Sequence, residues 1–147
     1  MKYFTIKELT HSDTAEARHI ANEPNEEQRK HLVELIEHLL DPLREAWGKP
    51  IRVSSGYRSA KLNATLGGSK TSAHLLGYAA DIQPIGESIS DFKAFVKEWL
   101  KISRVHYDQY IDEMSATSEW VHLGVKNAKG EQRKQNLKYR SGKYYAI

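Results

Sequence analysis

The segment SAHLLGYAAD, residues 72–81, combines a loop, a chain reversal and the start of a strand. Gly77 permits the reversal because glycine adopts backbone conformations that other residues avoid. Residues 78–82 are mostly small and apolar, which predicts a buried strand. Asp81 lies inside this strand, where a charge is costly unless a metal ion or an arginine balances it. The segment therefore predicts a buried strand that carries a polar site.

A second segment, EWVHLG at residues 119–124, has a similar character. His122 lies between two apolar residues of a strand that also looks buried. Together with His74 and Asp81 it forms a set of two imidazoles and one carboxylate, and such a set with an open fourth position is typical of catalytic zinc. Taken singly, a histidine in a strand is more often a hydrogen-bonded core residue. The metal site therefore requires that the two segments lie side by side.

The rest of the chain predicts helices and further strands around these segments. Apolar residues recur every three or four positions between Glu26 and Trp47, which predicts the main amphipathic helix, with Pro42 as a point where it kinks or restarts. The other predicted elements are a strand at 51–54, helices at 59–66 and 87–102, and strands at 109–114 and 119–125. We expect an α+β fold, with residues 1–147 as a single small domain, an antiparallel sheet flanked by helices, and the metal site in a cleft on the sheet.

Composition limits the classes of protein and site that fit this chain. Of the 147 residues, 39% are hydrophobic and 28% are charged, which is typical of a globular domain. The chain has no cysteine, which excludes disulfides, thiolate metal sites and cysteine nucleophiles. No stretch reaches the roughly 18 apolar residues of a membrane helix, so no membrane insertion is expected.

The C-terminal segment, residues 126–147, is basic and holds seven Lys or Arg residues against one Glu. Three tyrosines, Tyr139, Tyr144 and Tyr145, are interleaved with this charge. The segment predicts a final strand or an ordered tail, and a polyanion-binding edge is the functional alternative. Acidic stretches at 23–27 and 108–119 argue against nucleic acid as the partner.

The order Ser-x-His-x-x-Gly-x-Ala-x-Asp at residues 72–81, followed by Trp-Val-His at 120–122, resembles the zinc D-Ala-D-Ala carboxypeptidase family. That family also includes phage endolysins that cut L-Ala-D-Glu bonds, D-Ala-D-Ala dipeptidases and distant Hedgehog signalling domains. The upstream segment SSGYRS, residues 54–59, is similar to a further element of the family. The opening residues 5–10 and the Asn-Glu-Pro segment at 22–24 resemble phage and prophage members.

The resemblance implies a role for several residues. His74, Asp81 and His122 would bind one Zn²⁺ per chain. Glu119, three residues before His122, would act as the catalytic acid/base. Arg58 would bind a substrate carboxylate or the developing oxyanion, for which a guanidinium is well suited.

Two further residues are candidates for binding substrate. Ser72 would hydrogen-bond the substrate or help to order the loop that precedes His74. Tyr57 is a candidate lining residue of the pocket, with packing in the core as the alternative.

The acid/base has a second candidate in Glu113. In a regular strand, side chains three residues apart point to opposite faces, so Glu119 and His122 would diverge. Glu119 therefore requires the chain to curl before the strand begins. Glu113 lies on the neighbouring strand of the predicted hairpin and does not depend on that curl.

The metal-site pattern and the resemblance together imply a zinc-dependent hydrolase of peptide bonds in the peptidoglycan stem peptide. It would be either a D-Ala-D-Ala carboxypeptidase or an L-Ala-D-Glu-type endopeptidase, related to phage or prophage enzymes. The alternative is a catalytically inactive, zinc-containing module that binds peptidoglycan or a protein. The first residues lack the apolar run of a secretory signal, so we expect synthesis in the cytoplasm and action on the cell wall after release. We expect a monomer.

Overall fold

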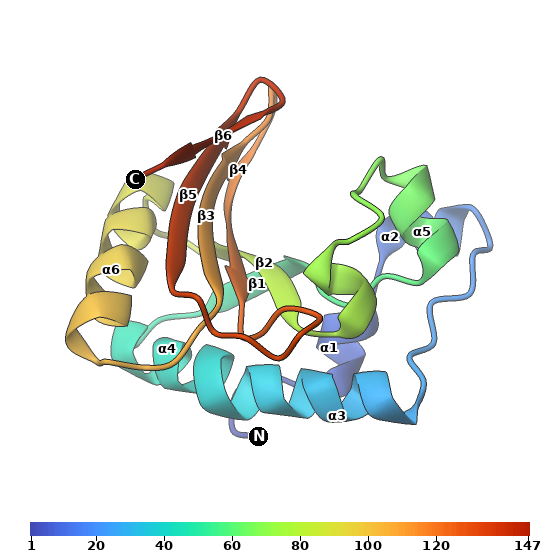
Figure 1. Ribbon diagram of the computed structural model, residues 1–147, viewed down its shortest axis with the longest axis horizontal. Coiled ribbons are helices and arrows are strands. Elements are labelled where there is room, and N and C mark those ends of the chain that lie inside the picture. Colours follow the sequence, from blue (N-terminus) through green and yellow to red (C-terminus); the bar gives the residue numbers. More distant parts are fainter.

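The computed structural model describes residues 1–147 and contains one six-stranded sheet with helices packed around it (Figure 1). The strands follow the spatial order β1-β2-β4-β3-β5-β6, and every neighbouring pair is antiparallel except β3 and β5. Their bounds are β1 (Ile51–Ser55), β2 (Ala79–Pro84), β3 (Gln109–Met114), β4 (Glu119–Gly124), β5 (Gln135–Arg140) and β6 (Lys143–Ala146). The predicted α+β class with a mostly antiparallel sheet is confirmed.

Local signals in the sequence account for where several helices begin. The side chain of Thr5 accepts a hydrogen bond from the backbone N–H of Glu8, and Asn25 and Gln28 form a reciprocal capping box. The helical elements are α1 (Ile6–Thr10), α2 (Asp13–Ala17), α3 (Glu26–Leu35), η1 (Ile36–Leu40), α4 (Asp41–Trp47), α5 (Ala60–Thr65), η2 (Ala73–Leu76) and α6 (Ile89–Ile102).

The segment from Glu26 to Trp47 is helical throughout, as its periodicity predicts, but it is not one regular α-helix. A single π-helical turn, η1, joins α3 to α4 just before Pro42. Proline lacks a backbone N–H and disturbs the hydrogen bonding of the preceding turn, and a π-turn absorbs that disturbance without a break. The apolar stripe is therefore kept, and its leucines and isoleucine are fully buried.

One face of the sheet packs on the helices and the other face is left for the site. Side chains alternate between the two faces of a strand. Val121 and Leu123 of β4 and Tyr110 of β3 belong to the hydrophobic core, together with Phe92 and Val96 of α6. The residues between them in sequence point to the opposite face. The alternation thus assigns each strand residue either to the core or to the site.

The C-terminal segment forms two strands instead of the single final strand or ordered tail that the sequence predicts. β5 lies beside β3 and runs parallel to it, and β6 folds back on β5. After β4 the chain passes β3 and returns on the other side of it, so that β5 runs parallel to β3. An unpaired β3 edge would expose backbone hydrogen-bonding groups, and β5 covers them.

A buried lysine links α6 to the sheet on its core face. Lys93 is only 8% exposed, and its Nζ lies 2.6 Å from Asp112 Oδ1 and 2.8 Å from Glu119 Oε1. Arg140 of β5 reaches the same Asp112 oxygen at 3.1 Å. Burial alone would raise the pKa of Asp112, but its hydrogen bond from Lys93 and its contact with Arg140 lower it. The network therefore holds α6, β3, β4 and β5 together through charge-assisted bonds.

Replacing Lys93 with methionine should lower the free energy of unfolding by about 2 to 4 kcal/mol, because two carboxylates lose their shared cation. Urea unfolding followed by circular dichroism would measure the change. Lys97→Met is the matched control, because Lys97 is exposed on the same helix and forms no ion pair. Equal stability of the two variants would contradict a structural role for the network.

No helix of the structure is both long enough and apolar enough to cross a membrane.

Candidate metal centre and active site

His74 is held in place by the loop and turn that surround it. The Ser72 side chain caps η2 by accepting a hydrogen bond from the backbone N–H of His74, at 3.2 Å. His74 Nδ1 lies 2.7 Å from the carbonyl oxygen of Gly56. Since a carbonyl only accepts hydrogen bonds, Nδ1 carries the proton and Nε2 presents its lone pair. The hydrogen bond to Gly56 therefore orients the His74 ring as a metal ligand requires.

Gly77 lets the chain turn from η2 into β2. Its φ of +80° is in the left-handed region, and a Cβ there would lie 2.7 Å from the carbonyl oxygen of Gln28. Only glycine fits both conditions without displacing the backbone. The turn brings β2 back beneath His74, so that Asp81 faces this histidine.

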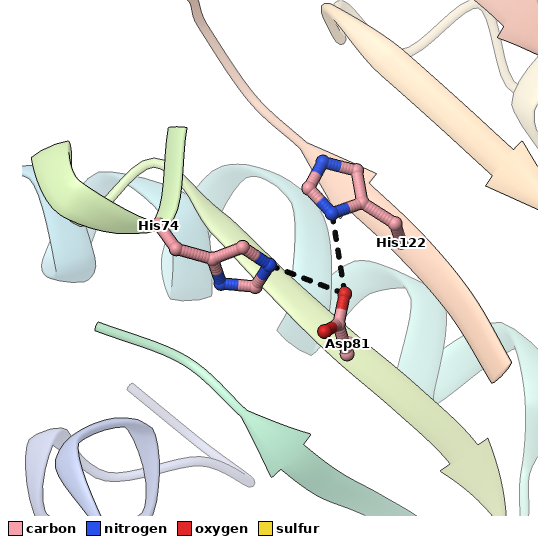
Figure 2. Close-up of side chains that lie close together, drawn as sticks. All are labelled: His74, Asp81 and His122. Atoms are coloured by element: carbon pink, nitrogen blue, oxygen red, sulfur yellow. Dashed lines mark hydrogen bonds and ion pairs between the residues drawn. The ribbon is translucent and has the colours of Figure 1, made fainter. Parts of the chain in front are cut away.

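Asp81 and His122 are paired neighbours on β2 and β4. His74 Nε2 and His122 Nδ1 each lie 3.2 Å from the same oxygen, Oδ1 of Asp81, as Figure 2 shows. One ligand atom from each residue falls within 4.8 Å of the others. The structure therefore brings together the two segments that the sequence could not place side by side.

The burial of the three side chains and the charge states of His74 and Asp81 fit a metal ion. All three are buried. Burial lowers the pKa of His74, which favours the neutral imidazole. Burial alone would raise the pKa of Asp81, but the two histidines hold it well below its usual range and keep the carboxylate charged. Burial alone would lower the pKa of His122, but its contact with Asp81 and the charge of Glu113 raise it. The ring nitrogen of His122 that faces Asp81 is Nδ1, and Nε2 is buried on the other side of the ring without a hydrogen-bond partner.

Arg58 lies on the β1 side of the cluster and is held by three contacts. Its guanidinium reaches Asp81 Oδ2 at 3.4 Å, Asn63 Oδ1 at 3.3 Å and Ser55 Oγ at 3.0 Å. The side chain is largely buried but lines the cleft above the cluster. A guanidinium has five N–H donors, so donors remain for a ligand in the cleft.

Glu113 lies on the other side of the cluster, on β3. Its Oε1 is 3.7 Å from His122 Nδ1 and accepts a hydrogen bond from Trp120 Nε1 at 3.1 Å. Burial, and then the charge of Asp81, raise the pKa of Glu113. A carboxylate whose pKa is raised toward neutrality is suited to exchanging protons. Asp108 and Glu131 also line the cleft, but Glu113 is the carboxylate outside the cluster that contacts one of its residues.

The cluster opens into a cleft of about 790 Å³. One wall is formed by Arg58, by the loop that follows α5 and by η2, and the opposite wall is formed by β3, the loop after β4 and the β5–β6 hairpin. The cluster and Glu113 lie between these walls on the open face of the sheet. The predicted location of the site, in a cleft on the sheet, agrees with this arrangement.

A protein-family model described as peptidase M15 matches residues 2–124, which include all the residues of the cluster, Arg58 and Glu113. The match covers most of the 147 residues. The chain belongs to the peptidase M15 family. The resemblance noted in its sequence is thereby confirmed.

A curated relative supports the same assignment. This M15 chain is 46% identical over 44 residues to the zinc D-Ala-D-Ala carboxypeptidase of Streptomyces albus G. The match covers 29% of the M15 chain and 17% of the relative. The similarity is therefore local, and the match leaves most of the relative's length uncovered.

Glu119, the first candidate for the acid/base, is not brought to the cleft. It is the first residue of β4, so the curl that would turn it toward His122 is absent. Its carboxylate binds Lys93 on the core face of the sheet. Glu113, the second candidate, is the one that the M15 chain places beside His122.

The two candidate substrate-binding residues have different surroundings. Ser72 lines the cleft, but its hydroxyl caps η2 and orders the chain at His74. Tyr57 is buried in the hydrophobic core and does not line the cleft, so the packing alternative describes its position. Its backbone N–H donates a hydrogen bond to the carbonyl oxygen of Leu9.

Sequence reasoning missed three contributors to the site. Asn63 is buried, binds Arg58 through its Oδ1 and binds the carbonyl of Ser69 through its Nδ2, so it ties the arginine to the loop after α5. Trp120 binds Glu113, and the β5–β6 hairpin forms a wall. The alternation of Trp120 with His122 along β4 was the available signal for Trp120. No local signal places Asn63 or the hairpin.

Proposed function

We propose that this chain is a zinc peptidase that hydrolyses peptide bonds in the peptidoglycan stem peptide. The convergence of His74, Asp81 and His122 on one point, with Glu113 beside them in an open cleft, is the observation that carries the proposal. Membership of a peptidase family supports hydrolysis of a peptide bond. The name of the Streptomyces albus G relative supports both zinc and a substrate ending in D-Ala-D-Ala.

The three ligands suit zinc because they supply nitrogen and oxygen donors and leave a position open. When bound there, zinc would polarise the scissile carbonyl and make water a competent nucleophile at neutral pH. The hydrogen bond from His74 Nδ1 to Gly56 would keep that ring in the orientation and tautomer needed for binding.

Glu113 would move the protons of the reaction. Its carboxylate takes a proton from the attacking water and passes it to the nitrogen of the leaving amine, which prevents expulsion of an unstable anion. The Trp120 indole, which donates to Oε1, would hold the carboxylate in position and leave Oε2 for the proton.

Arg58 would bind the negative charge of the substrate. A guanidinium pairs well with a carboxylate and also stabilises a developing oxyanion. Because Ser55, Asn63 and Asp81 fix its position, the donors are oriented before substrate arrives. A terminal carboxylate bound by Arg58 would favour the carboxypeptidase over the endopeptidase as the specific activity.

The test is to incubate the zinc-loaded protein with purified peptidoglycan and identify the released ends by mass spectrometry, with and without a chelator. Chelator-sensitive release of D-Ala would support a carboxypeptidase, and new L-Ala carboxyl ends would identify an endopeptidase of the phage type. Zinc bound without any release would refute hydrolysis and would favour a module that only binds the cell wall. We propose that the protein acts as a monomer.

A further inference from the structure

The outer wall of the cleft comes from a part of the chain that the family match does not include. The match ends at residue 124, and the segment after it forms the loop 125–134 and the β5–β6 hairpin. Asn127, Lys129, Arg133, Leu137, Tyr139 and Tyr144 all line the cleft from this segment. The residues of the metal centre thus lie within the segment that the family model matches, and the residues of the outer wall lie in the segment after it.

This wall is fixed to the sheet. Asp108, which is buried, accepts hydrogen bonds from Arg133 through the backbone N–H, Nε and the terminal nitrogen, at 2.8 to 3.1 Å. A bidentate arginine–carboxylate pair on a buried acceptor is a strong, oriented contact. β5 then pairs with β3 over five residues, and β6 pairs with β5 over four. The hairpin therefore has a defined position beside the site.

Strand register aligns Glu113 with two tyrosines. Glu113 of β3 is paired with Tyr139 of β5, and Tyr139 is paired with Tyr144 of β6. Paired residues on neighbouring strands share a face of the sheet. Tyr139 and Tyr144 also contact each other, with ring centroids 4.8 Å apart. Glu113, Tyr139 and Tyr144 therefore form a row across β3, β5 and β6, on the face of the sheet that carries the metal centre.

Tyr144 is the exposed end of this row. It lines the cleft and is 57% exposed, and its hydroxyl forms no hydrogen bond within the protein. Burial of part of the ring, and then the charge of Glu113, raise its pKa, with smaller contributions from Tyr139 and Asp81. The hydroxyl therefore keeps its proton at neutral pH.

We propose that Tyr144 contacts the substrate and donates a hydrogen bond from its hydroxyl to the carbonyl oxygen of the bond that is cut, from the side of the cleft opposite Arg58. The inference rests on the proposed peptidase function. A neutral phenol is a suitable donor, because it stabilises negative charge on that oxygen and adds no charge of its own. The hairpin thereby supplies a catalytic residue from outside the family-matched segment.

The test compares Tyr144→Phe with Tyr145→Phe. Tyr145 is the matched control, because it is the next residue on β6, is 46% exposed and lies on the opposite face of the strand, where Lys138 approaches its ring. We expect Tyr144→Phe to lower kcat on a stem peptide by about 10- to 100-fold, with KM changed less than threefold, because only a donor to the reacting oxygen is lost. Tyr145→Phe should leave both constants unchanged.

Binding of a phosphinate analogue, whose tetrahedral anionic centre resembles the reacting state, provides a second measurement. Tyr144→Phe should weaken this binding by a similar factor, and both variants should melt at the temperature of the parent. Unchanged kcat and unchanged phosphinate affinity in Tyr144→Phe would overturn the role of Tyr144. A parent protein that releases no peptide from peptidoglycan would instead refute the proposed function, and this role would fall with it.

Discussion

Glu113→Gln should lower kcat by about 10²- to 10⁴-fold, the range that general acid–base catalysis contributes. Glutamine has nearly the same shape and can still contact Trp120, but it cannot accept the proton of the attacking water. Zinc content and KM should remain close to those of the parent, because Glu113 is not one of the three converging ligands. Steady-state hydrolysis of a stem peptide, with zinc measured in the same samples, checks the expectation.

Glu119→Gln is the matched control for this substitution. This substitution makes the same chemical change on the neighbouring strand, but the carboxylate of Glu119 lies on the core face, where it binds Lys93. We expect kcat within about twofold of the parent and only a modest loss of stability, because the partner carboxylate of Lys93, Asp112, remains. If Glu119→Gln removed turnover and Glu113→Gln did not, the assignment based on the position of the two side chains would be wrong.

The second large effect concerns zinc and stability. At a free zinc concentration about a thousandfold above its dissociation constant, binding to the folded state alone adds about 4 kcal/mol, or about 10 °C in Tm for a domain of this size. Removing zinc with a chelator should lower Tm by that amount, and adding it back should restore both Tm and hydrolysis. Differential scanning calorimetry of the apo and zinc-loaded protein provides the measurement.

Asp81→Asn should abolish most of this zinc-dependent shift and lower activity by about 10²-fold or more, because it removes the charged ligand that both histidines approach. Asp13→Asn is the control. Asp13 belongs to an exposed group with His11 and Glu16 in which the two carboxylates contact different nitrogens of a single imidazole. A zinc-dependent shift that survived in Asp81→Asn and disappeared in Asp13→Asn would relocate the metal site.

The candidate metal ligands could be picked out from the sequence, although not brought together, because the signal that marks each of them is local. Gly77 marks a reversal, Asp81 is a charge in an apolar strand, and His122 is an imidazole in another. Such signals depend on the cost of burying a polar group and on the conformational freedom of glycine, which are properties of a few consecutive residues. The amphipathic helix at 26–47 was predictable for the same reason, and only its π-turn was not.

The choice between Glu113 and Glu119 could not be made from the sequence alone. The choice depends first on whether the chain curls at residue 119 or already belongs to β4 there. It then depends on strand register, because a shift of one residue moves a side chain from the core face to the cleft face. Lys93, distant in sequence, provides the partner that holds Glu119 on the core face. Both carboxylates are candidates in the sequence. The packing of α6 against the sheet places Glu119 on the core face, whereas Glu113 lies on the cleft face.

The sequence by itself determined which residue types this chain offers to a metal and which face of each element is apolar, because both follow from nearest-neighbour chemistry and periodicity. Tertiary structure alone decided which of those residues meet. Strand pairing set His122 opposite Asp81, and the parallel addition of β5 to β3 aligned Tyr144 with Glu113. These contacts join segments far apart in the chain, and their geometry is fixed by register and crossover, which no local pattern encodes.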